Sequence, residues 1–247
     1  MNKTTPTLDR DAFAADYIRI VSSARAMEKY ATREMADRFF LLTERLLAAN
    51  AVMNLTAITD PREIILKHYF DSLRLAQHLH KVGASLADVG CGAGFPTLPL
   101  AIARPDLAVT AIDSTDKRIV FVRETAAALG LTNVTAVTAR AEDAGAGELR
   151  GTFDYVTARA VARLNILAEL CLPFVKPGGY FLAMKAAAAA EELEEAKRGI
   201  ARLGGRVEKT ETYDIDGAPR CVIVIRKERP TPPAYPRRYA KIKQSPL

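Results

Sequence analysis

Short apolar runs alternate with helical stretches along the chain from Leu86 onward, and this alternation restricts the possible folds more than any other feature. Strands separated by helices are typical of a parallel sheet that is covered by helices on both faces. We therefore predict an α/β fold built on a doubly wound sheet. Its strands are expected at 85–89, 108–113, 133–138, 154–158, 180–184, 206–213 and 220–226, with helices between the first five and a further helix near 187–203.

A glycine-rich loop follows the first expected strand. Residues 87–99 read ADVGCGAGFPTLP, so Gly90, Gly92 and Gly94 stand at alternate positions after the strand. Glycine lets a ligand lie against the main chain, because no Cβ intervenes. A dinucleotide fold requires GxGxxG, whose third glycine brings the helix close to a pyrophosphate. Here the third glycine comes one residue early and Phe95 follows it, so the loop favours a ligand without a pyrophosphate.

An aspartate ends the second expected strand. Asp113 lies 23 residues after Gly90 and precedes Ser114 and Thr115, and an acid near this spacing binds a ribose hydroxyl pair. The order of strand, glycine loop, helix, strand and acid indicates S-adenosylmethionine as the cofactor; a glycine loop that serves only a tight turn is the alternative. After the third strand, Glu142 is a candidate acceptor for the adenine amino group; complementing the dipole of the next helix is its alternative role.

The last two expected strands are joined by the short segment IDGAP at 215–219. This connection predicts an antiparallel hairpin at the edge of the sheet. Seven strands that end in such a hairpin are the architecture of Rossmann-like methyltransferases and not of nicotinamide-dependent dehydrogenases. We therefore predict a class I methyltransferase fold with a seven-stranded, mostly parallel sheet.

Helices are expected before the sheet. Residues 8–50 carry apolar residues at helical spacing without Gly or Pro, which predicts two helices followed by a connection over 51–60. The motif Asp60-Pro61-Arg62-Glu63 is typical of a helix start, and this helix should run to about His80. We expect three parts: an N-terminal helical extension over 1–80, a cofactor-binding core over 81–228 and a basic, proline-rich tail over 229–247.

The net charge of +6 lies entirely in residues 226–247, which hold seven basic residues and one acid. Five prolines are interleaved with the basic residues and are expected to keep the segment extended. A neutral body with a basic tail indicates an anionic partner that is reached through the tail. A solvated chain end is the alternative.

Other sequence features argue against a secreted, membrane or metal-binding protein. The N-terminus MNKTTPTLDR has no apolar segment of the kind found in a secretory signal. The most apolar stretch, 86–103, contains an aspartate, three glycines and two prolines, which a membrane-spanning helix would not. The three cysteines are widely spaced, so neither a disulfide framework nor a zinc site is expected. We expect a cytoplasmic protein without membrane association.

The fourth expected strand, FDYVTARA, carries the residues that would face a transferred methyl group. It lacks the Asn/Asp-Pro-Pro-aromatic motif of adenine-N6 enzymes, and Cys171 lies too far along to serve as the nucleophile of a pyrimidine-C5 enzyme. The segment ARAVAR also lacks a carboxylate or histidine that could act as a base. Guanine N7 needs no base, because it carries a lone pair and no proton. Arg159 suits guanine O6 or phosphate, since a guanidinium donates in a rigid fork; a strand-end salt bridge is its alternative role.

Taken in order, the motifs of this chain resemble those of the RsmG (GidB) family, bacterial methyltransferases that form 7-methylguanosine in 16S ribosomal RNA. The matching segments include NLTAI at 54–58, KHYFDSL at 67–73, DVGCGAGFP at 88–96, IDSTDKR at 112–118, ARAVA at 158–162, the MK at 184–185 and PPAYPRR at 232–238. The chain departs from the family pattern at Thr97 and Ala186, where glycine is common.

The resemblance implies S-adenosylmethionine as the cofactor and 16S ribosomal RNA, or a small-subunit assembly intermediate, as the substrate. We expect the protein to be a monomer. With the loop residues above, the predicted cofactor-binding residues are Gly90, Gly92, Gly94, Phe95, Asp113, Ser114, Thr115, Ala141, Glu142 and Arg159. The predicted catalytic residues are Arg159, Arg140, Lys185 and Asn54, and the resemblance also implies roles near the substrate for His68 and Asp71. Two alternatives are a methyltransferase for a small molecule or a protein, and an RNA-binding module without catalysis.

Overall fold

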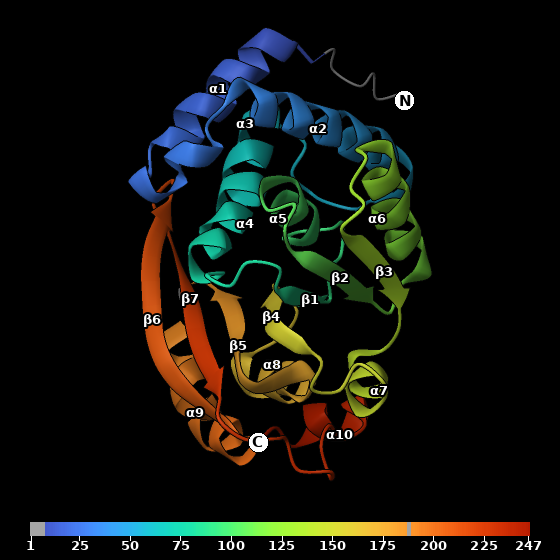
Figure 1. The fold of residues 1–247 in the computed structure, drawn as a ribbon, viewed down its shortest axis with the longest axis vertical. Helices are drawn as coiled ribbons and strands as arrows, with labels where there is room; N and C mark the ends of the chain where they lie inside the picture. Colours follow the sequence, from blue (N-terminus) through green and yellow to red (C-terminus); the bar gives the residue numbers. More distant parts are fainter. Residues whose placement is uncertain (1–7, 187–188) are drawn as a thin grey trace.

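The computed structural model describes residues 8–186 and 189–247, and a seven-stranded sheet lies at its centre (Figure 1). The strand order is β3-β2-β1-β4-β5-β7-β6. The strands are β1 (Ser85–Val89), β2 (Ala108–Asp113), β3 (Val134–Thr138), β4 (Phe153–Arg159), β5 (Val175–Lys185), β6 (Gly205–Ile215) and β7 (Ala218–Lys227). Strands β1 to β5 are parallel, and β7 runs antiparallel between β5 and β6. The predicted fold class is confirmed, with β5 beginning at Val175 rather than at residue 180.

Helices cover both faces of the sheet (Figure 1). One face carries α5 (Thr97–Ala103), α6 (Asp116–Ala128) and the helical segment from α3 (Pro61–Ile64) to η3 (Arg74–His78), with α1 (Arg10–Ser22) and α2 (Arg33–Met53) outside them. The other face carries α7 (Ala141–Ala146), α8 (Leu164–Cys171), α9 (Ala189–Arg202) and α10 (Tyr239–Gln244). Each face therefore has its own buried apolar cluster. None of the helices in residues 8–186 and 189–247 combines the length and apolar character that a membrane span needs.

The helical extension follows the prediction with two differences. Helix α2 runs to Met53, three residues into the expected connection, and Asn54 ends it in the left-handed conformation. The predicted start at Asp60 is confirmed, because its carboxylate accepts from the Glu63 N–H at 2.9 Å. After Ile64 the helix widens into the π-helix η2 (Ile65–Phe70), then continues as α4 (Asp71–Leu73) and η3. Such π-helical turns are frequent at functional sites.

The segment 229–247, here called the C-terminal arm, folds against the body of the protein. Arg150 donates to the carbonyls of Thr231, Pro232 and Tyr235 in the arm. The Arg237 guanidinium donates to both oxygens of Glu169, whose side chain is fully buried on α8. The prediction of an extended tail is therefore wrong: contacts with Arg150 and Glu169 hold the arm on the body, and residues 239–244 form α10.

Candidate active site

The glycine loop begins where β1 ends, at the carboxyl edge of the parallel strands. Gly90 has a φ of +75°, and its N–H donates to the Ile112 carbonyl of β2 at 2.7 Å. A Cβ on Gly90 would lie only 2.6 Å from a methyl group of Val161, in the segment after β4. The close approach of these two loops explains why glycine is required here. In open α/β sheets, ligands bind at this edge.

Asp113, at the end of β2, connects the glycine loop to the start of α6. One carboxylate oxygen accepts from the Gly92 N–H at 3.0 Å, and the other accepts from the Thr115 N–H at 2.8 Å. The side chain is almost buried, yet it lines a cavity of about 310 Å³. This smaller cavity is also lined by Ser114, Arg140, Ala141, Glu142 and Tyr239 of the C-terminal arm. The acids and the small residues at its wall suit a ribose and an adenine ring.

A larger cavity of about 630 Å³ also borders Gly90. Its wall comes from the glycine loop, the ends of β4 and β5, the connection after α2, the helical segment around η2, the first turns of α6 and α9, and the hairpin of β6 and β7. The residues that bear functional groups include His68, Asp71, Arg118, Arg159, Lys185, Glu192, Tyr213 and Arg220. Both cavities are lined by Gly90, Arg118 and Ala160, so they are neighbours. An elongated ligand with its ribose at Asp113 fits this arrangement, since its other end would reach the larger cavity along the backbone of the glycine loop.

Arg159 is held in place by three partners from the η2–α4 segment. One guanidinium nitrogen donates to the Asp71 carboxylate and to the Lys67 carbonyl, each at 3.0 Å. The other lies 3.3 Å from His68 Nδ1, and the guanidinium carbon lies 5.6 Å from the centre of the Phe95 ring. The salt bridge considered from the sequence is therefore present. Arg159 still lines the larger cavity, where it contributes a fixed positive charge.

His68 lies between the glycine loop and the helical extension. Its ring stacks on Phe95 with 4.5 Å between ring centres. Because a guanidinium can only donate, His68 Nδ1 accepts from Arg159, so the proton is on Nε2, which lies 3.0 Å from the Thr56 hydroxyl. Burial, with the nearby charge of Arg159, lowers the pKa of His68 to about 3. This histidine is neutral and both its nitrogens are occupied, so it is unsuited to accept a proton during a reaction.

Thr97 accounts for one departure from the family pattern. Its hydroxyl donates to a carboxylate oxygen of Asp88 at 2.7 Å, and its N–H donates to the same oxygen at 3.2 Å. Asp88 lies fully buried beneath the glycine loop, and burial raises its pKa to about 6. A glycine at position 97 would leave this carboxylate with one hydrogen bond fewer.

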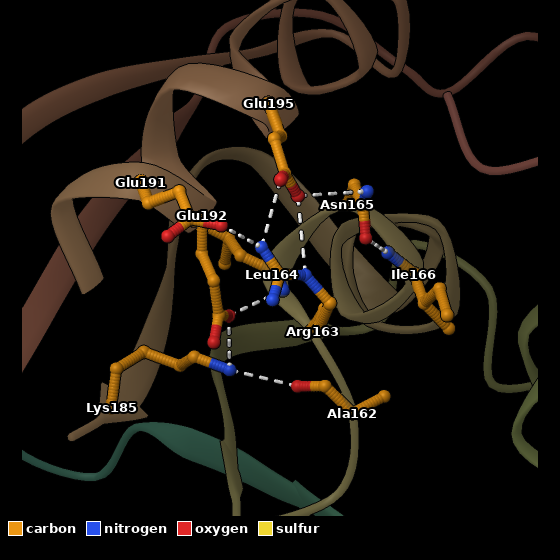
Figure 2. A network of polar contacts seen from close by, with 9 residues as sticks. All are labelled: Ala162, Arg163, Leu164, Asn165, Ile166, Lys185, Glu191, Glu192 and Glu195. Carbon is orange, nitrogen blue, oxygen red and sulfur yellow. Dashed lines mark hydrogen bonds and ion pairs between the residues drawn. The ribbon is translucent and has the colours of Figure 1, made fainter. Parts of the chain in front are cut away.

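Lys185, at the end of β5, lies against Glu192 of α9, with 2.6 Å between Nζ and the carboxylate (Figure 2). The sequence analysis assigned no site role to Glu192, which lies with Glu191 in the first turn of α9, where acids commonly complement the helix dipole. The signal in the sequence was weak: an acid seven residues after Lys185, across a connection of unknown shape.

The predicted site residues divide into two groups. Those that line one of the two cavities are Gly90, Gly92, Phe95, Asp113, Ser114, Arg140, Ala141, Glu142, Arg159 and Lys185. The other three have different positions. Gly94 packs against Leu98, Thr115 supports Asp113 through its N–H, and Asn54 is exposed at the end of α2, next to the cavity residues Leu55 and Thr56.

Comparison with known proteins decides the family. The family model described as rRNA small subunit methyltransferase G (GidB) matches residues 35–216. The chain belongs to this family. The relative from Staphylococcus carnosus, named ribosomal RNA small subunit methyltransferase G, is 49% identical over 85% of this chain and 90% of its own length. The one from Limosilactobacillus reuteri, with the same name, is 47% identical over 89% of this chain and 90% of its own length. The predicted RsmG (GidB) family is confirmed.

Solved structures confirm the predicted methyltransferase fold. Pyrococcus horikoshii TYW2 in complex with MeSAdo has a TM-score of 0.52 at 20% identity, covering 63% of this chain and 61% of that chain. A 16S rRNA adenine-N1 methyltransferase from Catenulisporales acidiphilia, solved with its cosubstrate SAM, has a TM-score of 0.50 at 18% identity, covering 65% of this chain and 93% of that chain. At these identities the likeness concerns the fold, and the GidB family rests on the closer relatives.

Proposed function

We propose that this GidB-family protein transfers a methyl group from S-adenosylmethionine to N7 of a guanine in 16S ribosomal RNA. The observation that carries the proposal is the pair of neighbouring cavities that share Gly90 in their walls. One holds Asp113 and small residues that suit a nucleoside, and the other holds cationic side chains that suit RNA. S-adenosylmethionine, when bound, supplies an electrophilic methyl group at the boundary between them.

The residues of the smaller cavity are proposed to bind the cofactor. Asp113 accepts from the ribose hydroxyls at the lone pairs that the Gly92 and Thr115 N–H groups leave free. Glu142 accepts from the adenine amino group, beside Ala141 and Ser114. Gly92 borders the larger cavity and has open space where a Cβ would be, so its backbone leaves room for the methionine part.

The residues of the larger cavity are proposed to position the guanine. The N7 lone pair forms the new bond to the methyl carbon, and the electrons of the broken carbon–sulfur bond stay on sulfur. No proton moves, which agrees with a neutral His68 whose nitrogens are both occupied. Proximity and alignment then provide the catalysis. Arg159 and Lys185 place positive charge near O6 and phosphate, and Arg140 does so at the rim of the smaller cavity.

Several finer points belong to the same proposal. The enzyme acts as a cytoplasmic monomer, on 16S ribosomal RNA or on a small-subunit assembly intermediate. We divide the chain into three parts: the helical extension over 1–80, the core over 81–228 and the C-terminal arm over 229–247. Asn54 does not line the larger cavity, but the next two residues, Leu55 and Thr56, do. We propose that Asn54 contributes to catalysis by positioning these two residues.

The test is methylation of purified small-subunit RNA and particles from cells that lack the protein. Mass-spectrometric nucleoside mapping should find one new 7-methylguanosine that depends on added protein and S-adenosylmethionine. Replacing the modified guanosine by 7-deazaguanosine should abolish transfer. Methylation at another atom, or transfer to the 7-deaza RNA, would refute the N7 assignment.

A further inference from the structure

Lys185 and Glu192 form a charged pair in the wall of the larger cavity. They come from the end of β5 and the first turn of α9, and both side chains are about one-tenth exposed. Each lines the cavity that also holds Arg159 and the glycine loop. Burying a charged pair costs hydration, so such a pair needs further hydrogen bonds to hold it.

The backbone of the segment between β4 and α8 provides those hydrogen bonds (Figure 2). Lys185 Nζ donates to the Ala162 carbonyl at 2.8 Å, and the Leu164 N–H donates to Glu192 Oε2 at 2.8 Å. Beside them, Arg163 binds Glu191 and Glu195 on the outer side of α9. The pair is thus fixed to the segment that directly follows Arg159, where the methyl acceptor is expected.

The pair has hydrogen-bonding capacity to spare. An ammonium group has three donors, and contacts with Glu192 and Ala162 occupy two of them. Both contacts of Glu192 go to Oε2, and within residues 8–186 and 189–247 Oε1 has no hydrogen-bond partner. Asp71, the other carboxylate among the described cavity residues, accepts at both oxygens, from Tyr213 and Arg159. The wall therefore presents a donor next to an acceptor at one place.

Guanine has the complementary pattern on its Watson–Crick edge. O6 accepts, and the adjacent N1–H and 2-amino groups donate. Adenine is reversed there, with an amino donor at position 6 and an acceptor at N1. Unpaired bases are commonly recognised on this edge. N7 lies on the far side of O6 from N1, so contacts at O6 and N1 leave it free to react.

We propose that Lys185 and Glu192 read the Watson–Crick edge of the target guanine, with Lys185 donating to O6 and Glu192 Oε1 accepting from N1–H. The inference rests on the proposed function and adds the base-selecting contact to it. Glu192 becomes a specificity-determining residue, and Lys185 acts with it rather than as a general phosphate contact.

The test compares guanosine with 2,6-diaminopurine at the mapped target nucleotide, in small-subunit RNA assembled by ligation. Diaminopurine keeps N7 and the 2-amino group but presents a donor at position 6 and an acceptor at N1. The measured quantity is the ratio of kcat/KM for the two RNAs, for the wild type and the Glu192→Gln variant. The two bases differ in the intrinsic reactivity of N7, but this difference is the same for both proteins. It therefore cancels when the ratio of the variant is compared with that of the wild type. The matched control is Glu195→Gln, on the outer side of the same helix.

Glu192→Gln should lower the guanosine-to-diaminopurine ratio by about tenfold or more, since it removes the carboxylate that accepts from guanosine N1–H and lets glutamine donate to the bare N1 of diaminopurine, and a hydrogen bond to a charged group is worth about that factor. Glu195→Gln should keep the wild-type ratio. Equal loss on both RNAs would overturn the proposal, because a purely structural role of Glu192 affects both alike. If Glu192→Gln no longer bound S-adenosylhomocysteine, the wild type alone would decide. Equal kcat/KM values of the wild type on the guanosine RNA and on the diaminopurine RNA would refute the contact. Failure of the wild type on guanosine itself would refute the proposed function instead.

Discussion

Arg159 and Asp71 are joined by a 3.0 Å ion pair in the wall of the larger cavity, although they lie 88 positions apart in the sequence. The second oxygen of Asp71 accepts from the Tyr213 hydroxyl of β6 at 2.7 Å. The carboxylate therefore connects the end of β4, the helical extension and the edge strand of the sheet.

Replacing Asp71 by asparagine should destabilise the protein more than removing its contact with β6 alone. Asp71→Asn leaves the Arg159 charge without its counter-ion, and we expect a loss of about 2–4 kcal/mol in the free energy of unfolding, because Arg159 keeps some contact with solvent. Tyr213→Phe should cost only about 1–2 kcal/mol. Urea denaturation of both variants tests this order, and equal losses would contradict it.

Loss of the Asp113 carboxylate should weaken cofactor binding. Asp113→Asn is expected to lower the affinity for S-adenosylhomocysteine by about 1.5–3 kcal/mol, the range for a hydrogen bond to a charged group. Isothermal titration calorimetry measures it, with Asp116→Asn, in the next helix, as the matched control. An unchanged affinity in the Asp113 variant would remove this residue from the ribose site.

The Arg237–Glu169 pair should be essential to the C-terminal arm. Arg237→Ala removes the guanidinium that pairs with a fully buried carboxylate and leaves it only the main-chain N–H of residue 237, so a loss of about 3–5 kcal/mol is expected. Arg238→Ala, at the exposed neighbouring position, should change stability by less than about 0.5 kcal/mol. Thermal melting compares the two. Cofactor affinity should also fall in the Arg237 variant, because Tyr239 of the arm lines the smaller cavity; identical melting curves would argue against a structural arm.

Exposed charges of the arm should contribute to RNA affinity without holding the fold. Arg238, Lys241 and Lys243 are exposed, whereas Arg237 is committed to Glu169. Replacing all three by glutamine should reduce the slope of log K against log salt by about two, since each contact with a single-stranded phosphate contributes about 0.7. Binding to 16S ribosomal RNA at several salt concentrations checks this. An unaltered slope would place the RNA contacts elsewhere on the protein.

Lys227 should make stability depend on pH in the alkaline range. Burial, together with the charge of Arg150, lowers its pKa to about 7, and its ammonium donates to the carbonyls of Leu172 and Leu203. Between about pH 7 and pH 10 the folded chain binds fewer protons at this group than the unfolded chain, so the free energy of unfolding should rise with pH. Lys227→Met should lack this rise. Urea denaturation at several pH values gives both slopes, and parallel slopes would show that Lys227 does not titrate there.

Local patterns gave reliable predictions of this fold. The order of strands and helices, the hairpin of β6 and β7, and the Asp60 cap depend on residues that are near one another in sequence, so periodicity and spacing were sufficient. The same holds for Gly90 and Asp113, which the topology of the sheet brings to one edge.

Long-range contacts were the part that the sequence could not provide. The burial of Glu169 under Arg237 depends on two residues 68 positions apart, and it converts an expected extended tail into a packed arm. The partnership of Lys185 with Glu192 depends on how α9 packs on α8. Such contacts arise from tertiary packing, which composition and proline content do not encode.

The nearly buried position of Lys185 and Glu192 also restricts when a substrate is available. A guanine inside a helix uses its Watson–Crick edge to pair with cytosine, and it would have to leave the stack to reach this wall of the cavity. Under our proposal the enzyme therefore senses pairing as well as base identity. Methylation would be confined to the interval in which its target strand is open, and the methyl group would then be a lasting record that the ribosomal RNA passed through that open state.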